Sequence, residues 1–139
     1  HHPQEILATL SAVRSTVEQL LDGHERIRLF PPFTYQRLVS EMASAYLIIT
    51  DSGGIQEEAP FLKKPVLILR DVTERPEAVE LGVARLVGTD VTAVINAARE
   101  LLTDKTVYAK MAMGGSPYGD GYAARRIAAA FGLVESPAL

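Results

Sequence analysis

The sequence contains no cysteine, no long apolar run and no surplus of positive charge. Without cysteine the chain has no disulfide, no thiol nucleophile and no cysteine-ligated zinc, which fits a protein of the cytoplasm. The apolar runs are too short to span a bilayer, and no signal peptide is visible, so we expect no membrane association. The formal net charge of −3 argues against a general nucleic-acid binder.

Histidine is also scarce, with three residues in the chain. Together with scattered carboxylates they form no recognisable metal-ligand set, and no Ser–His–acid spacing indicates a hydrolase. His1 and His2 fit the tail of a purification tag. We therefore expect neither a metal site nor a catalytic triad.

What is present is the composition of one folded domain, which we predict over residues 1–139. The chain is 47% apolar and 22% charged, enough apolar content for a core. Short apolar segments typical of strands alternate with helix-period segments. The strands are expected at residues 26–30, 46–50, 65–69 and 84–87, and helices around residues 38–42, 53–62, 76–81, 91–102, 105–113 and 121–131.

The alternation predicts an α/β fold, a parallel sheet with helices on both faces. The segments 46–50 and 65–69 are predicted to be strands buried on both faces. Apolar residues at helical spacing over residues 6–21 predict that the chain opens on a helix. Because an α/β half-domain usually begins with a strand, we expect structure to be missing before it.

The segment Thr50-Asp-Ser-Gly-Gly-Ile-Gln-Glu-Glu58 carries the strongest functional pattern. A strand ends, Gly53 and Gly54 turn the chain, and a helix begins, so unpaired amides and the helix dipole form an anion site suited to phosphate. Ser52 adds a hydroxyl donor, and Glu58 is placed to accept the hydroxyls of a ribose. The alternative is a Ser52 N-cap with Gln56 completing a capping box, serving stability alone. One of Glu57 and Glu58 is expected on a solvated helix face.

Two further segments follow predicted strands or precede helices. Residues 70–77 are rich in charge, and Arg75 is placed to meet phosphate oxygens; the alternative is a surface loop whose charges pair with each other. In residues 116–121 a proline and two glycines fix a turn, and Asp120 or a neighbour is expected to cap the last helix. A structural turn is as plausible there as a ligand role.

These segments carry a family resemblance. Thr50-Asp-Ser-Gly-Gly-Ile-Gln-Glu-Glu-Ala-Pro60, Lys64-Pro-Val-Leu-Ile-Leu-Arg-Asp71, Thr73-Glu-Arg-Pro-Glu-Ala-Val79, Leu86-Val-Gly-Thr-Asp90 and Pro117-Tyr-Gly-Asp-Gly121 resemble the non-hydrolysing bacterial UDP-N-acetylglucosamine 2-epimerases. The match runs over about residues 20–131. It implies the C-terminal, Rossmann-like half of a two-domain glycosyltransferase-B-type fold, with the N-terminal half absent.

The resemblance also implies an activity. The family interconverts UDP-GlcNAc and UDP-ManNAc by eliminating UDP with loss of the C2 proton and adding UDP back, without metal or NAD. Carried onto matching positions, Ser52, Gly53 and Gly54 hold the diphosphate, Glu58 accepts the ribose hydroxyls and Arg75 contacts the phosphates. The catalytic acids lie in the absent half, so we expect this chain alone to be inactive. Its implied partners are a UDP-sugar, the missing domain and a second subunit in a homodimer.

The chain departs from the family pattern in three places. Ser116 replaces the usual Asn, residues 80–83 replace a common Glu-Ala-Gly-Thr, and His2 is only a loose match to a family histidine. Three alternatives remain open: the donor-binding half of a glycosyltransferase of the same architecture, a hydrolysing epimerase, and a stand-alone nucleotide-binding module.

Overall fold

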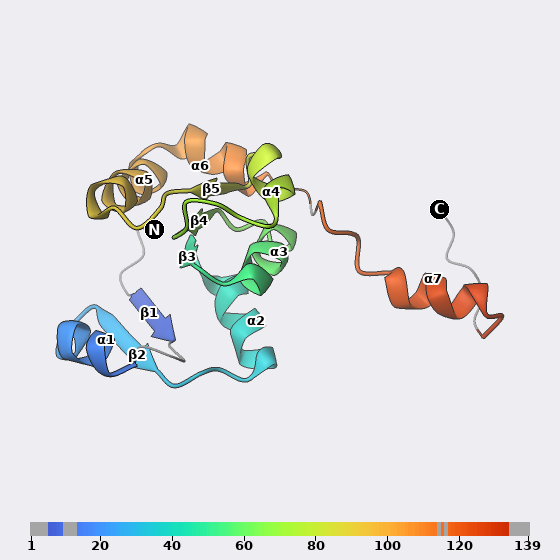
Figure 1. The fold of residues 1–139 in the computed structure, drawn as a ribbon, viewed down its shortest axis with the longest axis horizontal. Coiled ribbons are helices and arrows are strands. Elements are labelled where there is room, and N and C mark those ends of the chain that lie inside the picture. The colour runs from blue at the N-terminus through green and yellow to red at the C-terminus, as the bar shows by residue number, and fades with distance from the viewer. Residues whose placement is uncertain (1–5, 10–13, 114, 116, 134–139) are drawn as a thin grey trace. The chain divides into compact units, whose positions relative to one another are not determined.

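The computed structural model describes residues 6–9, 14–113, 115 and 117–133 (Figure 1). His1, His2 and Ser116, which entered the sequence predictions, lie outside these residues. The chain divides into two compact units, His1–Tyr46 and Leu47–Leu139, and each is described by itself. Whether the two units together form the single domain predicted over residues 1–139 is not tested by this division, and that domain stays a prediction.

The first unit is a β-α-β-α arrangement. It contains β1 (Ile6–Thr9), α1 (Arg14–Leu21), β2 (Ile27–Phe30) and α2 (Tyr35–Ser44). The two strands pair in parallel, with Ile6 opposite Ile27. The connection through α1 is the crossover that parallel strands require.

The prediction that the chain opens on a helix is wrong. The apolar residues over 6–21 belong to two elements, a four-residue strand and the helix α1. A few apolar residues at the start of a segment fit both periods, and only the pairing of β1 with β2 separates them. The expectation of missing structure rested on an opening helix and loses that support.

The second unit is a three-stranded parallel sheet with the order β3-β4-β5 and covering helices. The predicted strands and helices of this part are all found, within a few residues of the expected bounds. The elements are β3 (Ile48–Thr50), α3 (Gly53–Phe61), β4 (Val66–Ile68), α4 (Pro76–Glu80), β5 (Ala84–Leu86), α5 (Val91–Thr103), α6 (Lys105–Ala112) and α7 (Ala123–Ala130).

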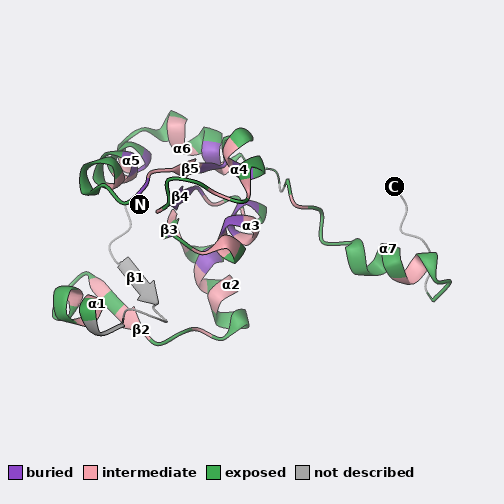
Figure 2. Cartoon of the chain, in the orientation of Figure 1, coloured by how far each residue is buried: buried purple, intermediate pink, exposed green. Residues whose placement is uncertain are grey.

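The central strand β4 forms the core of this unit, where the buried residues gather (Figure 2). All three of its side chains are fully buried. Leu67 packs with Ala97, Leu101 and Met111 of α5 and α6. Since side chains alternate along a strand, the neighbours of Leu67 point to the other face, and α3 also packs on β4. The predicted α/β fold with helices on both faces is confirmed.

The prediction that residues 46–50 are buried on both faces is wrong. In β3 only Thr50 is buried, and Ile49 is 43% exposed. This strand lies at the edge of the β3-β4-β5 sheet and has one neighbour in it, whereas β4 has two. Apolar composition alone does not distinguish an edge strand from a central one.

The helix boundaries follow from local hydrogen bonds. Asp90 caps α5 by accepting from the backbone N–H of Ala93 at 2.8 Å. Asp104 caps α6 by accepting from Thr106 and Val107 at 2.8 and 3.1 Å. Both caps were predicted. Asp120 accepts from the N–H of Tyr122, just ahead of α7, but the N-cap residue of that helix is Tyr122 itself.

Candidate functional site

The N-terminus of α3 is built by a tight connection from β3. The hydroxyl of Thr50, the last residue of β3, accepts from the backbone N–H of Ser52 at 3.0 Å. Ser52 is extended, and its carbonyl accepts from Gln56 N–H at 3.2 Å, which starts the helix. The Ser52 side chain makes no capping hydrogen bond. The capping-box alternative is therefore wrong, and the hydroxyl is not committed to the helix.

Arg75 lies directly against the first residue of α3. A Cβ atom placed on Gly53 would sit 3.1 Å from Nη1 and 3.2 Å from Cζ of Arg75. A side chain at Gly53 would push against the guanidinium, so glycine permits this close approach. The first amides of a helix have no partner within it and carry partial positive charge. The guanidinium adds a full positive charge beside them, so two features that attract anions meet here.

Two carboxylates contact this guanidinium. Nε of Arg75 donates to Glu57 Oε1, and Nη1 lies 3.5 Å from Glu74 Oε2. The hydrogen bond with Glu57 and its negative charge raise the pKa of Arg75. Glu57 is thus paired with Arg75 and is not a free charge on a solvated face. The alternative, a surface loop whose charges pair with each other, applies to the pair of Arg75 and Glu74 but not to the pair of Arg75 and Glu57, which joins the loop to α3.

The loop that carries Arg75 is anchored by side chains from two other segments. Thr73 donates from its hydroxyl to Oε1 of Gln56 at 2.6 Å and accepts from the N–H of Arg75 at 3.1 Å. The Tyr118 hydroxyl donates to the carbonyl of Arg75 at 3.2 Å and accepts from Ala78 N–H at 3.3 Å. Burial raises the pKa of Tyr118. The backbone of Arg75 is therefore held on both sides.

Glu58 lies in the second turn of α3. Its Oε2 is buried and has no hydrogen-bond partner among the residues that the structure describes. A buried carboxylate oxygen without a donor is costly, because it has lost its water and gained nothing in return. Such an atom is suited to accept from a ligand hydroxyl.

The structure thus places the predicted residues as follows. Ser52, Gly53 and Gly54 form the entry to α3, Arg75 lies against Gly53, and Glu58 follows along the same helix. We call these five residues the α3 entry site. The supporting contacts of Glu57, Thr73 and Tyr118 with Arg75 or its loop were not predicted from the sequence. For Tyr118 there was a signal, because it sits in the Pro-Tyr-Gly-Asp-Gly turn.

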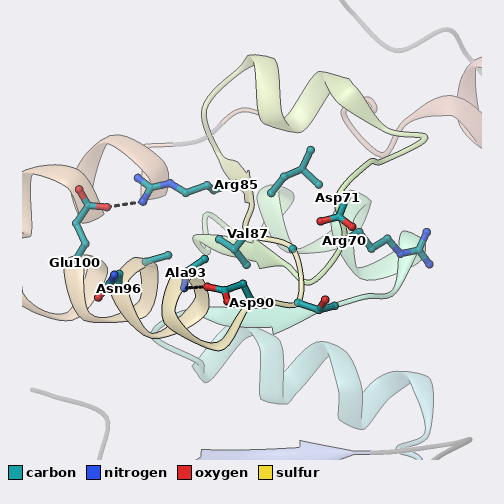
Figure 3. A pocket seen from close by; sticks show the side chains of 12 residues that line it. Arg70, Asp71, Arg85, Val87, Asp90, Ala93, Asn96 and Glu100 are labelled. Atoms are coloured by element: carbon teal, nitrogen blue, oxygen red, sulfur yellow. Dashed lines mark hydrogen bonds and ion pairs between the residues drawn. The ribbon is translucent and has the colours of Figure 1, made fainter.

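A separate hollow of about 910 Å³ lies at the ends of β4 and β5, beside α5 (Figure 3). Arg70 and Asp71 contribute to its lining, but none of the α3 entry site does. Figure 3 shows Arg85 and Glu100 reaching toward each other, and they form an ion pair. The helix start that lines this hollow, that of α5, is capped by the carboxylate of Asp90, whereas Ser52 makes no capping bond at the start of α3, so the hollow offers the weaker anion site.

Neither a metal cluster nor a membrane span is found in the part of the chain that the structure describes. No group of three or more His, Asp or Glu side chains there is placed to hold a metal ion. No helix among those residues is long and apolar enough to cross a membrane.

A family model described as UDP-N-acetylglucosamine 2-epimerase matches residues 4–132. The chain belongs to the UDP-N-acetylglucosamine 2-epimerase family. The Yersinia pestis UDP-N-acetylglucosamine 2-epimerase is 53% identical over 115 residues, which cover 83% of this chain and 31% of that protein. The Escherichia coli K12 enzyme of the same name is 50% identical over the same shares. The chain therefore spans about a third of the length of these relatives.

Solved structures of this family share the fold. The S. aureus MnaA–UDP co-structure matches with a TM-score of 0.85 and 38% identity, over 96% of this chain and 39% of that one. The Neisseria meningitidis UDP-GlcNAc 2-epimerase bound to UDP-GlcNAc matches with a TM-score of 0.83 and 40% identity, over 91% and 36%. The epimerase resemblance stated from the sequence is confirmed.

Proposed function

We propose that this chain is the UDP-binding part of a UDP-N-acetylglucosamine 2-epimerase, and that the α3 entry site holds the nucleotide. The observation that carries the proposal is the close approach of the Arg75 guanidinium to Gly53 at the start of α3. The relatives described as bound to UDP or UDP-GlcNAc support it. In this proposal Ser52 and the amides of Gly53 and Gly54 bind the diphosphate together with Arg75.

Glu58 supplies the second half of the recognition. Its buried oxygen, which has no partner among the described residues, accepts a hydrogen bond from the ribose of UDP in this proposal. A ribose diol offers two donors, and an ionised carboxylate is a strong acceptor. The site therefore combines a cationic end for the diphosphate with an anionic acceptor for the sugar of the nucleotide.

The chemistry gives this site a role beyond binding. In epimerisation through UDP elimination and re-addition, negative charge grows on the leaving diphosphate as the anomeric C–O bond breaks. Preorganised donors at that position stabilise the developing charge. We further propose that the groups that move the C2 proton lie outside these 139 residues. The chain alone then binds UDP weakly and does not turn over UDP-GlcNAc.

The family resemblance also implies where and how the longer protein works. It implies a cytoplasmic enzyme that forms a homodimer and needs neither metal nor NAD. Formation of UDP-ManNAc from UDP-GlcNAc without an acceptor, by the longer protein that carries this chain, would distinguish an epimerase from a glycosyltransferase. Release of free ManNAc and UDP would instead indicate the hydrolysing type.

Calorimetric titration with UDP tests the site directly. The 139-residue chain, checked for folding by far-UV circular dichroism, is expected to bind UDP weakly. Arg75→Ala and Glu58→Ala are both expected to abolish measurable binding. Arg99→Ala and Glu80→Ala, which remove exposed charges of the same types elsewhere on this unit, are the matched controls and should leave the affinity unchanged.

The ribose assignment has its own test. UDP lacking the 2′-hydroxyl is expected to bind about tenfold more weakly than UDP, because one hydrogen bond to a charged acceptor is lost. Unchanged affinity in Glu58→Ala would remove the ribose role. An unmodified chain that is folded and does not bind UDP would remove the proposal as a whole.

A further inference from the structure

The guanidinium of Arg75 is tied to the helix whose start it covers. Glu57 lies on α3, and its Oε1 accepts from Nε of Arg75. The same guanidinium lies against Gly53, with Nη1 and Nη2 within 3.6 Å of the position of a Gly53 Cβ. One edge of the planar group is thus occupied by Glu57. The Nη atoms remain near the first turn of α3.

The backbone of Arg75 does not determine this orientation by itself. Thr73 and Tyr118 hold the N–H and the carbonyl of Arg75, but an arginine side chain has several rotatable bonds beyond them. The side chains of Arg75 and Glu57 are only partly covered, at 33% and 41% exposed. Without a partner at Nε, the guanidinium would sample other rotamers in solvent, since ordering such a side chain costs conformational entropy.

The negative charge of Glu57 allows two explanations of its role beside the anion site to be distinguished. A carboxylate close to an anion-binding helix terminus opposes anion binding on Coulomb grounds alone. If charge were its whole effect, removing Glu57 would strengthen the binding of a diphosphate. If its effect is to orient Arg75, removing it would weaken that binding. The two explanations differ in sign.

We propose that Glu57 is a positioning residue of the UDP site, which fixes Arg75 so that its Nη edge faces the start of α3 and meets the diphosphate. This inference rests on the proposed function of the α3 entry site. A guanidinium that donates from both Nη atoms gives the bidentate geometry that phosphate oxygens favour. Glu57 itself does not touch the nucleotide.

The test compares Glu57→Ala, Glu57→Gln and Glu74→Ala by calorimetric titration with UDP. Glu57→Ala removes the acceptor and is expected to weaken UDP binding about fivefold, a modest effect because the pair is partly exposed. Glu57→Gln keeps an acceptor oxygen for Nε and is expected to stay within about twofold of the unmodified chain. Glu74→Ala removes the other nearby carboxylate, 3.5 Å from Nη1, and controls for charge alone. It should not weaken binding.

A spectroscopic measurement reports the orientation without ligand. The Nε–H resonance of Arg75 in a ¹⁵N-correlated spectrum, assigned by its loss in Arg75→Lys, should be shifted by the hydrogen bond. We expect this shift to persist in Glu57→Gln and to disappear in Glu57→Ala. Far-UV circular dichroism of each variant shows whether the fold is retained.

The outcomes separate this inference from the proposed function. If the unmodified chain binds UDP and Arg75→Ala does not, the site stands. Stronger or unchanged binding by Glu57→Ala would then overturn the positioning role alone. If Glu57→Gln weakened UDP binding as much as Glu57→Ala, the positioning role would also be overturned, because glutamine keeps an acceptor for Nε. It would be overturned as well if Glu74→Ala weakened UDP binding, because Glu74 is not the acceptor of Nε. Failure of the unmodified chain to bind UDP would instead reject the function.

Discussion

Replacing Thr73 by valine tests whether one hydroxyl holds the Arg75 loop against α3. Thr73 and valine have nearly the same shape, so the exchange removes the hydroxyl and little else. That hydroxyl makes two hydrogen bonds, one to Oε1 of Gln56 at 2.6 Å and one from the N–H of Arg75 at 3.1 Å. Gln56 is only 1% exposed, so water does not readily replace the donor that it loses.

The magnitude follows from the environment of each partner. Leaving the buried oxygen of Gln56 without this donor costs about 1–3 kcal/mol, and losing the partly buried bond to the Arg75 N–H costs about 0.5–1 kcal/mol. The new methyl group, at a half-buried position, returns less than about 0.8 kcal/mol. We expect Thr73→Val to lower the free energy of unfolding by about 2 kcal/mol. UDP binding should weaken as well, because Arg75 loses a backbone anchor.

Urea denaturation followed by far-UV circular dichroism measures the change in stability, and calorimetry measures UDP affinity. Thr92→Val is the matched control, because Thr92 is an exposed threonine in the first turn of α5. Its replacement should change stability by less than about 0.5 kcal/mol. If Thr73→Val lost no more stability than Thr92→Val, the loop would not depend on the Thr73 hydroxyl, and the account of how Arg75 is anchored would be refuted.

Three further predictions concern the stability of the fold. Gly88→Ala should cost about 1–2 kcal/mol by urea denaturation, because φ is +64° there; the new Cβ would lie 2.8 Å from Oδ1 of Asp71, but that exposed side chain can turn away at little cost. Gly23→Ala, with φ +84° and open space, should cost about 1 kcal/mol. Leu101→Ala should cost about 3 kcal/mol in the same assay, because Leu101 is fully buried against β4. The pKa of Asp120 is lowered to about 2 from 3.8, chiefly by its hydrogen bond from Arg126, so the stability it contributes is present above pH 4 and is lost as pH falls toward 2. When unfolding is followed by circular dichroism as the pH is lowered, Asp120→Asn should remove this loss of stability between pH 4 and 2. If the variant lost stability over the same pH range as the unmodified chain, the ion pair of Asp120 with Arg126 would not stabilise the fold.

The start of α3 was predictable because its signal is local. An apolar strand, twin glycines and a helix follow one another closely from Ile48 to Phe61, and each step has a simple physical consequence. The strand ends, the chain turns, and a helix starts with free amides. The predicted caps Asp90 and Asp104 are local in the same sense, since each bonds to amides two or three residues away.

The first strand was not predictable on these grounds. Its four residues precede a genuine helical stripe, and apolar residues at the junction extend the stripe by chance. What makes residues 6–9 a strand is pairing with β2, about twenty positions later in the chain. Similarly, the exposure of Ile49 depends on the edge position of β3, which no property of the segment 46–50 records.

The contacts around Arg75 show the same limit at the level of single side chains. Glu57 and Glu58 are adjacent in the sequence and have the same side chain. Glu57 is the partner of an arginine 18 positions away, and Glu58 keeps a buried oxygen that has no partner among the residues that the structure describes. Helical geometry places neighbouring residues about 100° apart around the axis, so they face different surroundings. Only the position of the Arg75 loop decides which carboxylate it meets.

This arrangement explains why affinity for a diphosphate should depend on geometry more than on total charge. The guanidinium of Arg75 contacts two carboxylates, those of Glu57 and Glu74, so the charged side chains nearby do not by themselves favour an anion. The attraction has to come from oriented donors: the first amides of α3 and the Nη edge of Arg75. Oriented dipoles act over short distances and lose their effect when displaced. Small changes at Thr73 or Glu57, which leave the ligand contacts themselves intact, should therefore affect UDP binding more than the loss of an exposed charge does.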